Sequence, residues 1–170
     1  PLVGVYYATN GSIIQFTGGA ANAPLAPGSP LVLAGAGQYR FASGWVELPA
    51  DIIPGLQLTG GQLKLDAGFQ GGAITNLALD GITLTNINNL PVTGTFATTN
   101  SAVYGSYLVD SGGVWNANGN NIYSTVSIAA GGIFNDCGTV QIFLPGSMSV
   151  AANGQVNLIT GYLYLYAPLT

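Results

Sequence analysis

Short runs of β-branched and aromatic residues recur along the whole chain, and turn-forming dipeptides separate them. In the segment from Val3 to Phe16, for example, Asn10-Gly11 stands between two apolar runs. Asn-Gly in such a place is a strong signal for a tight turn, because both residues tolerate a positive φ. The chain contains only one Glu, one Lys and one Met, so several common helix formers are nearly absent. The pattern predicts an all-β protein with roughly a dozen or more strands.

The alternation of side chains predicts how these strands pair. Between Leu56 and Asp66, leucines alternate with Gln, Thr and Lys on both sides of a Gly-Gly turn. Half-buried antiparallel strands show this alternation, and short turns join them as hairpins. We therefore expect a single β domain over residues 1–170, folded as an antiparallel β-sandwich or jelly-roll barrel. The Gly-, Ala- and Pro-rich residues 18–30 are expected to form a long loop or an extended arm.

A parallel β-helix is the alternative fold. Residues 125–133 and 139–142 favour it, because their Val-x-Ile pattern with a following Gly-Gly resembles the rungs of autotransporter-like passenger domains. A solenoid should repeat with a fixed period, however, and no fixed period is evident along the chain. The hairpin-type turns also favour the sandwich, which is therefore the predicted fold.

The scarcity of charge indicates what the surface must look like. Charged residues make up 5% of the chain, whereas about 25% is usual in soluble domains. A surface built from uncharged side chains offers little charge repulsion between copies of the protein. We therefore expect a structural, self-assembling protein whose main partners are copies of itself.

The same composition argues against two other kinds of partner. Arg40 and Lys64 are the only basic residues and the net charge is −4, so the clustered cations that bind nucleic acid are missing. No apolar stretch reaches the length of about 18 residues that a transmembrane helix needs. We expect neither nucleic-acid binding nor direct membrane insertion.

The residues that catalysis usually requires are also scarce. The chain has no histidine, which excludes Ser-His-Asp triads and histidine-based metal sites. The closest acidic pair, Glu47 and Asp51, has a proline between its members, and Asp110 offers a single carboxylate for calcium. We predict no enzymatic activity, no cofactor and no bound metal. Cys137 is expected to be a small buried hydrophobe, with an intersubunit disulfide as the alternative.

Apolar character on two strand faces occurs near both ends of the chain. In residues 162–166, Tyr alternates with Leu, so neither face of the strand is polar. Such a strand is a pairing hazard at a sheet edge unless something covers it. Burial of both faces in the core would explain this pattern, and coverage by a neighbouring subunit is the alternative. We expect contacts between subunits to fall on a set of five residues: Val3, Tyr6, Tyr162, Tyr164 and Tyr166.

In its length, its β-content, the loop at 18–30 and the strand at 162–166, the chain resembles the small single jelly-roll capsid proteins of tailless icosahedral phages with an internal membrane. The resemblance implies a coat subunit of a virion, which builds a shell from many copies and can have a second coat protein as partner. Pro1 agrees with this, since Pro is well suited to follow a removed initiator Met and poorly suited to follow a signal-peptidase cut.

Two other functions are open from the sequence. Abundant Thr and Asn and the rung-like residues 125–142 favour a secreted β-rich filament or adhesin subunit, extracellular or on a cell surface, joined by strand exchange. A carbohydrate-binding module is the third possibility, because Trp45, Trp115 and several tyrosines could stack on sugar rings.

Overall fold

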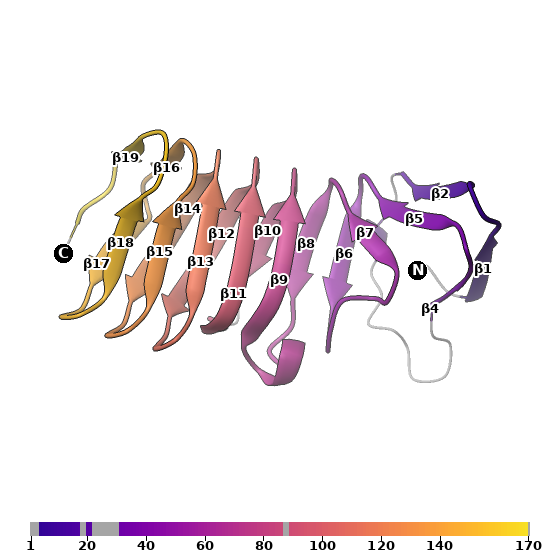
Figure 1. Cartoon of the computed structure of the whole chain (residues 1–170), viewed down its shortest axis with the longest axis horizontal. Helices are drawn as coiled ribbons and strands as arrows, with labels where there is room; N and C mark the ends of the chain where they lie inside the picture. Colours follow the sequence, from indigo (N-terminus) through magenta and orange to yellow (C-terminus); the bar gives the residue numbers. More distant parts are fainter. Residues whose placement is uncertain (1–3, 18–19, 22–30, 87–88, 170) are drawn as a thin grey trace.

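Every described strand pair in the computed structural model is parallel, and successive strands wind around one axis as the coils of a β-solenoid (Figure 1). The structure describes residues 4–17, 20–21, 31–86 and 89–169. The chain advances from β1 (Gly4–Ala8) at one end to β19 (Leu163–Leu165) at the other. Among the described residues, the short 3-10 turn η1 (Phe69–Gly71) is the only helix.

Two long faces and a smaller N-terminal sheet make up the solenoid. The face in front in Figure 1, here sheet I, contains β9 (Ile74–Asp80), β11 (Val92–Thr99), β13 (Val114–Asn118), β15 (Ile133–Asp136) and β18 (Gln155–Leu158). The opposite face, sheet II, contains β3 (Ala20–Ala21), β6 (Trp45–Leu48), β8 (Gln62–Leu65), β10 (Thr83–Asn86), β12 (Ala102–Val109) and β14 (Asn121–Ile128), then β16 (Val140–Ile142), β17 (Ser147–Val150) and β19. Sheet III contains β2 (Ile13–Phe16), β5 (Gln38–Phe41) and β7 (Leu56–Leu58), and β1 pairs with β4 (Leu31–Gly35).

The strand register reveals a repeat whose length changes along the chain. In sheet I, Asn135 lies beside Asn116 of the preceding coil, and the two are 19 positions apart in sequence. The next step in this sheet, from Asn135 to Asn157, is 22 positions. In sheet II, the step from Glu47 to Lys64 is only 17 positions. Because corner loops differ in length from coil to coil, a search for a fixed period misses the repeat, and the inference that the chain is not a solenoid was wrong.

The antiparallel β-sandwich or jelly-roll barrel predicted from the sequence is also wrong, and the parallel β-helix alternative describes the fold. The dipeptides that suggested hairpins are corners between different sheets: Asn10-Gly11 links β1 to β2, and Gly60-Gly61 links β7 to β8. Gly11 and Gly61 do have positive φ values, 78° and 86°. A solenoid corner therefore needs the same left-handed backbone as a hairpin turn, and the dipeptide cannot distinguish the two. The chain therefore does not have the jelly-roll fold that the resemblance to phage coat proteins implied.

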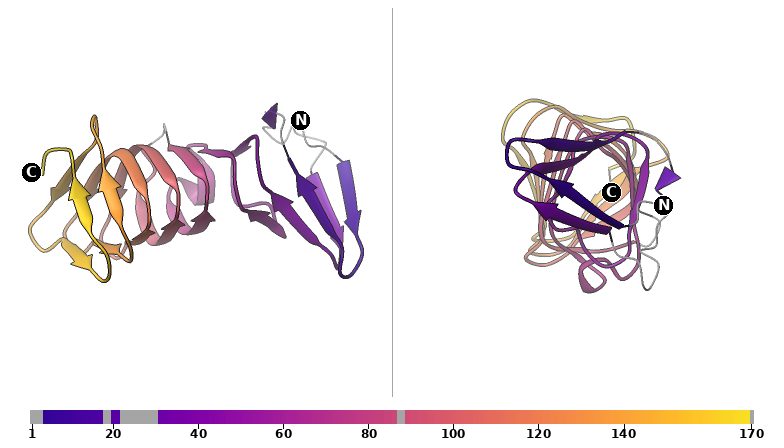
Figure 2. Two further views of the ribbon diagram at one scale, coloured as in Figure 1. Left: turned by 90° about the horizontal axis from the view of Figure 1, so that it is seen from above. Right: turned by 90° about the vertical axis from the view of Figure 1, so that its right-hand side faces the viewer.

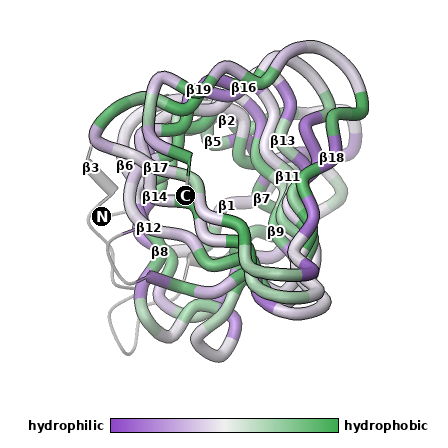
Figure 3. The backbone as a smooth tube through the Cα atoms, turned by 90° about the vertical axis from the view of Figure 1, so that its left-hand side faces the viewer, coloured by the Kyte–Doolittle hydropathy of each residue, from purple (hydrophilic) through white to green (hydrophobic). Residues whose placement is uncertain are grey.

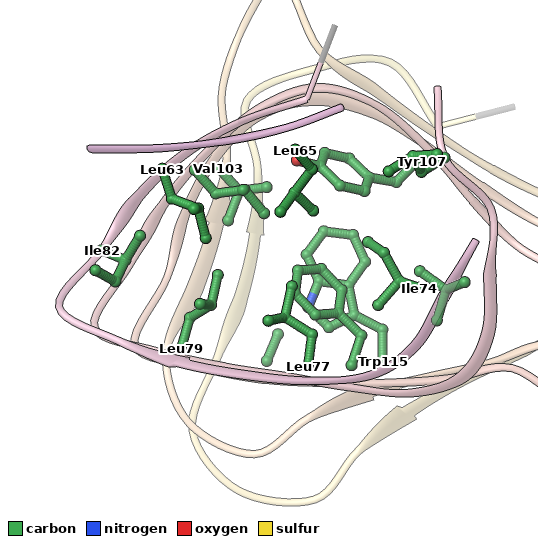
Figure 4. Packing of buried hydrophobic residues seen from close by; sticks show 14 of the residues in the cluster. Leu63, Leu65, Ile74, Leu77, Leu79, Ile82, Val103, Tyr107 and Trp115 are labelled. Carbon is green, nitrogen blue, oxygen red and sulfur yellow. The ribbon is translucent and has the colours of Figure 1, made fainter. Parts of the chain in front are cut away.

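Rows of inward side chains form the core. Phe96, Trp115 and Phe134 come from neighbouring strands of sheet I, with ring centroids 5.0 Å and 5.3 Å apart. Tyr107 reaches the same cluster from sheet II, with its ring 5.2 Å from that of Trp115 (Figure 4). Complete burial of one large apolar side chain contributes about 1.5–3 kcal/mol, so these rows are the main source of cohesion between coils.

Glycine permits the closest approach between coils. At Gly105 the φ angle is +119°, and a Cβ atom would lie 1.9 Å from the carbonyl oxygen of Asn86 in the preceding coil. No other residue fits there without moving the backbone. The local signal for this packing is a glycine inside an otherwise regular strand.

The predicted loop at 18–30 falls mostly outside the described residues. Ala20 and Ala21 are described, and they form β3 at the edge of sheet II, paired with Trp45 and Val46.

Candidate functional site

The last described coil, residues 147–169, presents core-type side chains on its outer surface; we call it the terminal coil. Leu158 continues the row of Asp136, and Leu165 continues the row of Ile142. Asp136 and Ile142 are fully buried, whereas Leu158 is 63% exposed and Leu165 is 38% exposed. The reason is that no described coil lies beyond β18 and β19 (Figure 3). Within the described chain, the interior packing surface of the solenoid is therefore uncovered at this end.

Three of the residues predicted to form a subunit contact lie on this coil. Tyr162, Tyr164 and Tyr166 are 67%, 42% and 55% exposed. The ring of Tyr164 lies 5.9 Å from that of Tyr162 and 6.3 Å from that of Tyr166. At the opposite end, Tyr6 is half-buried and contacts Phe16 edge to face. Val3 lies outside the described residues. The role of these five residues in a subunit contact stays a prediction.

Exposed large apolar side chains gather near the two ends of the described chain. Eight lie between Leu144 and Leu169 and four lie between Val5 and Val32. Between these regions, Tyr104 and Leu108 are the two described examples. The flanks of the solenoid are therefore polar or well packed, and the ends are the parts with apolar surface to cover.

Charged side chains, in contrast to the exposed apolar ones, are confined to the middle of the chain. Every charged side chain lies between Arg40 and Asp136, so residues 1–39 and 137–170 contain no Asp, Glu, Lys or Arg. Charged side chains on edge strands normally prevent unwanted pairing, and both ends of this chain lack them. The positions of the charged residues are visible in the sequence. The uneven distribution is missed when only the overall charge content of the chain is considered.

A ladder of stacked aromatic rings runs along the outside of sheet II to the terminal coil. Its members are Tyr104, Tyr123, Phe143 and Tyr166, with successive centroids 4.8, 5.0 and 5.1 Å apart and planes inclined by 9°, 15° and 8°. Each inner ring has both faces against its neighbours, so it cannot stack on a sugar ring. Of the tryptophans considered for sugar binding, Trp115 is fully buried and Trp45 is half-buried.

An asparagine ladder runs along the outside of sheet I. Asn135 Nδ2 donates to Asn116 Oδ1 at 2.8 Å, and Asn157 Nδ2 donates to Asn135 Oδ1 at 2.9 Å. Each amide thus donates toward the N-terminal end and accepts from the C-terminal side. Asn157, on the terminal coil, is the last described member, and a donor continuing this pattern would bond to its Oδ1.

Glu47 and Asp51, the closest acidic pair in the sequence, have different partners in the structure. Glu47 forms an ion pair with Lys64, whose Nζ lies 3.8 Å from Asp66 Oδ1. The Lys64 ammonium lowers the pKa of Glu47, and the hydrogen bond with Glu47 raises the pKa of Asp66. Asp51 instead accepts a hydrogen bond from Gln70 Nε2 at 3.0 Å. The charged side chains of this cluster therefore pair with one another on the flank of the solenoid.

Asp136 is an uncompensated polar group in the last core layer. Its Oδ1 accepts a hydrogen bond from the Gly138 N–H at 3.0 Å, but its buried Oδ2 has no partner among the described residues. Burial raises the pKa of Asp136, and the Gly138 N–H partly offsets that effect. The adjacent Cys137 is a free thiol and half-buried, with Sγ 3.9 Å from Asn135 O.

The described part of the chain contains no group of three or more His, Cys, Asp or Glu side chains that could hold a metal ion. None of its helical residues form a segment with the length and apolarity needed to cross a membrane. No protein-family model matches the chain, and no curated protein or solved structure matches it. The terminal coil, with its open core rows and its lack of charge, is therefore the candidate functional site, and its chemistry is that of an apolar contact surface.

Proposed function

We propose that this protein is the subunit of a structural, self-assembling β-solenoid filament, in which the terminal coil of one copy docks on the first coil of the next. The observation that carries the proposal is the exposure of Leu158 and Leu165, which occupy core rows but have no coil over them. Covering such side chains is favourable by roughly 25 cal/mol for each Å² of apolar surface removed from water.

The direction of the strands favours a head-to-tail contact. Among the described strands, β18 and β19 of the terminal coil each pair with one neighbour, and β1 and β2 at the other end also pair on one edge only. Edge strands of this kind are templates for further strands. Because every described strand pair is parallel, a copy stacked head to tail can place its β1 and β2 beside β18 and β19 with the same strand direction. A contact of this type joins two different surfaces and propagates as an open filament.

The occupant that best fits each end is a second copy of the chain. Both surfaces are uncharged and apolar, so neither attracts a charged partner, and no like-charge repulsion opposes contact between them. The aromatic and asparagine ladders both end on the terminal coil, so their last members, Tyr166 and Asn157, have one side available to a further coil.

The coat-subunit hypothesis shares self-association with this proposal, but stacking along the solenoid axis produces a line of subunits and not a shell. The filament hypothesis drawn from the sequence invoked strand exchange. Stacking of whole coils replaces exchange here, because no described strand pairs with the outer edges of β18 and β19, and these edges can pair without removing any strand from its own chain.

Sedimentation velocity and negative-stain electron microscopy of the purified chain test the proposal. We expect concentration-dependent assembly into rods, and we expect Tyr162→Glu to abolish it. Tyr162 is highly exposed and its one described ring contact is with Tyr164, so the change leaves the core intact. Leu108→Glu is the matched control, because Leu108 is an exposed apolar residue on the flank. A wild-type chain that stays monomeric, or equal loss of assembly in both variants, contradicts the proposal.

A further inference from the structure

The N-terminal strands lie at one end of the solenoid and the later coils extend from them along its axis (Figure 2). A groove lies between β7 of sheet III and β9 of sheet I. It has a volume of about 480 Å³, and its lining includes Leu56 and Leu58 of β7, Ala78 and Asp80 of β9, and, beyond the latter two, Ala97 and Thr99 of β11. Among the described strands, β7 is the edge of sheet III and β9 pairs only with β11, so no strand pairing joins β7 to β9. Two parallel strand edges therefore face each other across this groove.

The backbone of β9 directs hydrogen-bonding groups into the groove. Alternate residues of a strand direct their N–H and C=O groups to opposite edges. The Gly81 N–H donates to Thr99 O in β11. Leu79 and Leu77 lie two and four positions before Gly81, so their backbone N–H and C=O groups also point to β11. The backbone groups of Ala78 and Asp80 therefore point to the opposite edge of β9, toward the groove, as those of Asn76 do.

The side chain of Gln70 already acts as a strand partner at one end of this edge. Its Nε2 donates to Asn76 O at 2.8 Å, and its Oε1 accepts from the Asn76 N–H at 3.0 Å. The same Oε1 also accepts from the Thr75 N–H at 2.8 Å. The N–H and C=O of Asn76 are thus both paired with a side chain at this edge, and Ala78 and Asp80 are the next positions along it.

The backbone of β7, on the opposite wall, alternates in the same way. The Thr59 N–H donates to Phe41 O in β5 at 2.9 Å, so the backbone groups of Gln57 also point to β5. The backbone groups of Leu58 point to the groove. At Gly81 the walls converge, because a Cβ there would lie 3.5 Å from Thr59 O. The two walls therefore approach each other at Gly81, and Gln70 occupies the β9 edge at Asn76, at the other end of the lining.

We infer that this groove binds an extended peptide segment of a partner protein as an added β-strand, paired with Ala78 and Asp80 and carrying a basic side chain opposite Asp80. Strand addition obtains its affinity from main-chain hydrogen bonds and its specificity from alternate side chains. Apolar residues of the segment would face Leu56, Leu58 and Leu79, and the Asp80 carboxylate is the one charged group of the lining. This binding is independent of the stacking at the ends of the solenoid.

The probe is the hexapeptide Thr-Val-Thr-Val-Lys-Val with blocked termini, and the control peptide has Glu in place of Lys. We expect the Lys peptide to protect the Ala78 and Asp80 amides from hydrogen exchange, as measured by NMR on the whole chain. The Leu77 and Leu79 amides, already paired in sheet I, should not change. Absence of new protection at Ala78 and Asp80 with saturating peptide, or protection confined to the terminal coil, overturns the inference.

Two variants separate the backbone from the charge. Ala78→Pro removes the groove-facing N–H at a sheet edge, where Pro is tolerated, and should abolish binding, whereas Ala78→Ser keeps that N–H and should bind within about twofold of wild type. Asp80→Lys should weaken the Lys peptide by about threefold, as expected for an exposed ion pair, and should favour the Glu peptide. Equal affinity of Asp80→Lys for both peptides contradicts the role of Asp80, and undiminished binding by a folded Ala78→Pro variant contradicts strand addition.

Discussion

The rings of Tyr104 and Tyr123 stack with centroids 4.8 Å apart and planes inclined by 9°. The two residues lie one coil apart in sequence and are directly paired in register on β12 and β14. Their separation matches the strand spacing of a β-sheet, about 4.7–4.9 Å, so the stack is a direct consequence of one coil lying on the next. The same geometry produces the asparagine ladder, and it leaves the last member of each ladder on the terminal coil.

Removal of an inner ladder ring should destabilise the solenoid. Tyr123→Ala deletes the stacking of Tyr123 on both Tyr104 and Phe143. Since each aromatic pair contributes about 0.5–1.5 kcal/mol beyond simple burial, we expect the free energy of unfolding in urea to fall by about 1–3 kcal/mol. Tyr123→Phe keeps the ring and should stay within about 0.5 kcal/mol of wild type. Equal losses in the two variants would show that the hydroxyl, and not the stack, matters.

The asparagine ladder predicts a graded effect. Asn135→Ala removes two side-chain hydrogen bonds, whereas Asn157→Ala removes one. At about 1 kcal/mol for each hydrogen bond, Asn135→Ala should lower the free energy of unfolding by about twice as much as Asn157→Ala. Urea denaturation of the two variants measures this ratio. Identical losses would mean that the amides are bonded to water and not to one another.

Adjacent glycines test how closely the coils are stacked. A Cβ at Gly113 would lie 2.0 Å from the carbonyl oxygen of Val92 in the neighbouring coil, whereas at Gly112 it would meet no atom within 4 Å, although φ there is +80°. Gly112→Ala should therefore cost only the left-handed conformation, about 1–2 kcal/mol. Gly113→Ala should cost more, about 3 kcal/mol, because the backbone must shift. A Gly113→Ala protein as stable as Gly112→Ala in urea would contradict the close stacking.

Asp136 should make the chain less stable at neutral pH than in weak acid. Because burial raises its pKa in the folded state, folding favours the protonated form. Its contribution to stability is complete below its ordinary pKa of about 4 and is lost as the pH rises through the folded pKa. Asp136→Asn has no charge to bury and should unfold with a free energy about 1 kcal/mol higher at pH 7. Urea titrations across the pH range should show the two proteins converging in acid, and a difference independent of pH would contradict this account.

All-β structure could be predicted from local sequence, whereas the topology could not. Strand residues were identified, and Gly11 and Gly61 were recognised as turn residues although not as solenoid corners, because backbone requirements are local. Pairing is not local: an alternating strand such as Gln62–Leu65 buries one face in a parallel coil just as it would in an antiparallel sheet. Steps of 17, 19 and 22 positions between paired strands then conceal the repeat that would have identified the solenoid.

The candidate site was only partly predictable for the same reason. Tyr162, Tyr164 and Tyr166 could be singled out because two-faced apolar strands are unusual at an edge. Leu158 could not be recognised as an exposed core residue, because its row is defined by pairing with Asp136 in the preceding coil. The absence of charge outside residues 40–136 needed no structure and is the signal that a closer inspection of the sequence would have found.

Mixing two end-blocked variants tests the head-to-tail contact most directly. Val5→Glu places a charge on the exposed edge of the first described strand, and Tyr162→Glu places one on the terminal coil. Each variant keeps one intact end, so each alone should sediment as a monomer, and their equimolar mixture should form a species of two subunits that grows no further. The Val5→Glu, Tyr162→Glu double variant should stay monomeric in every mixture. Rods formed by Val5→Glu alone, or a mixture that remains monomeric while the wild type assembles, would contradict head-to-tail stacking of the solenoid.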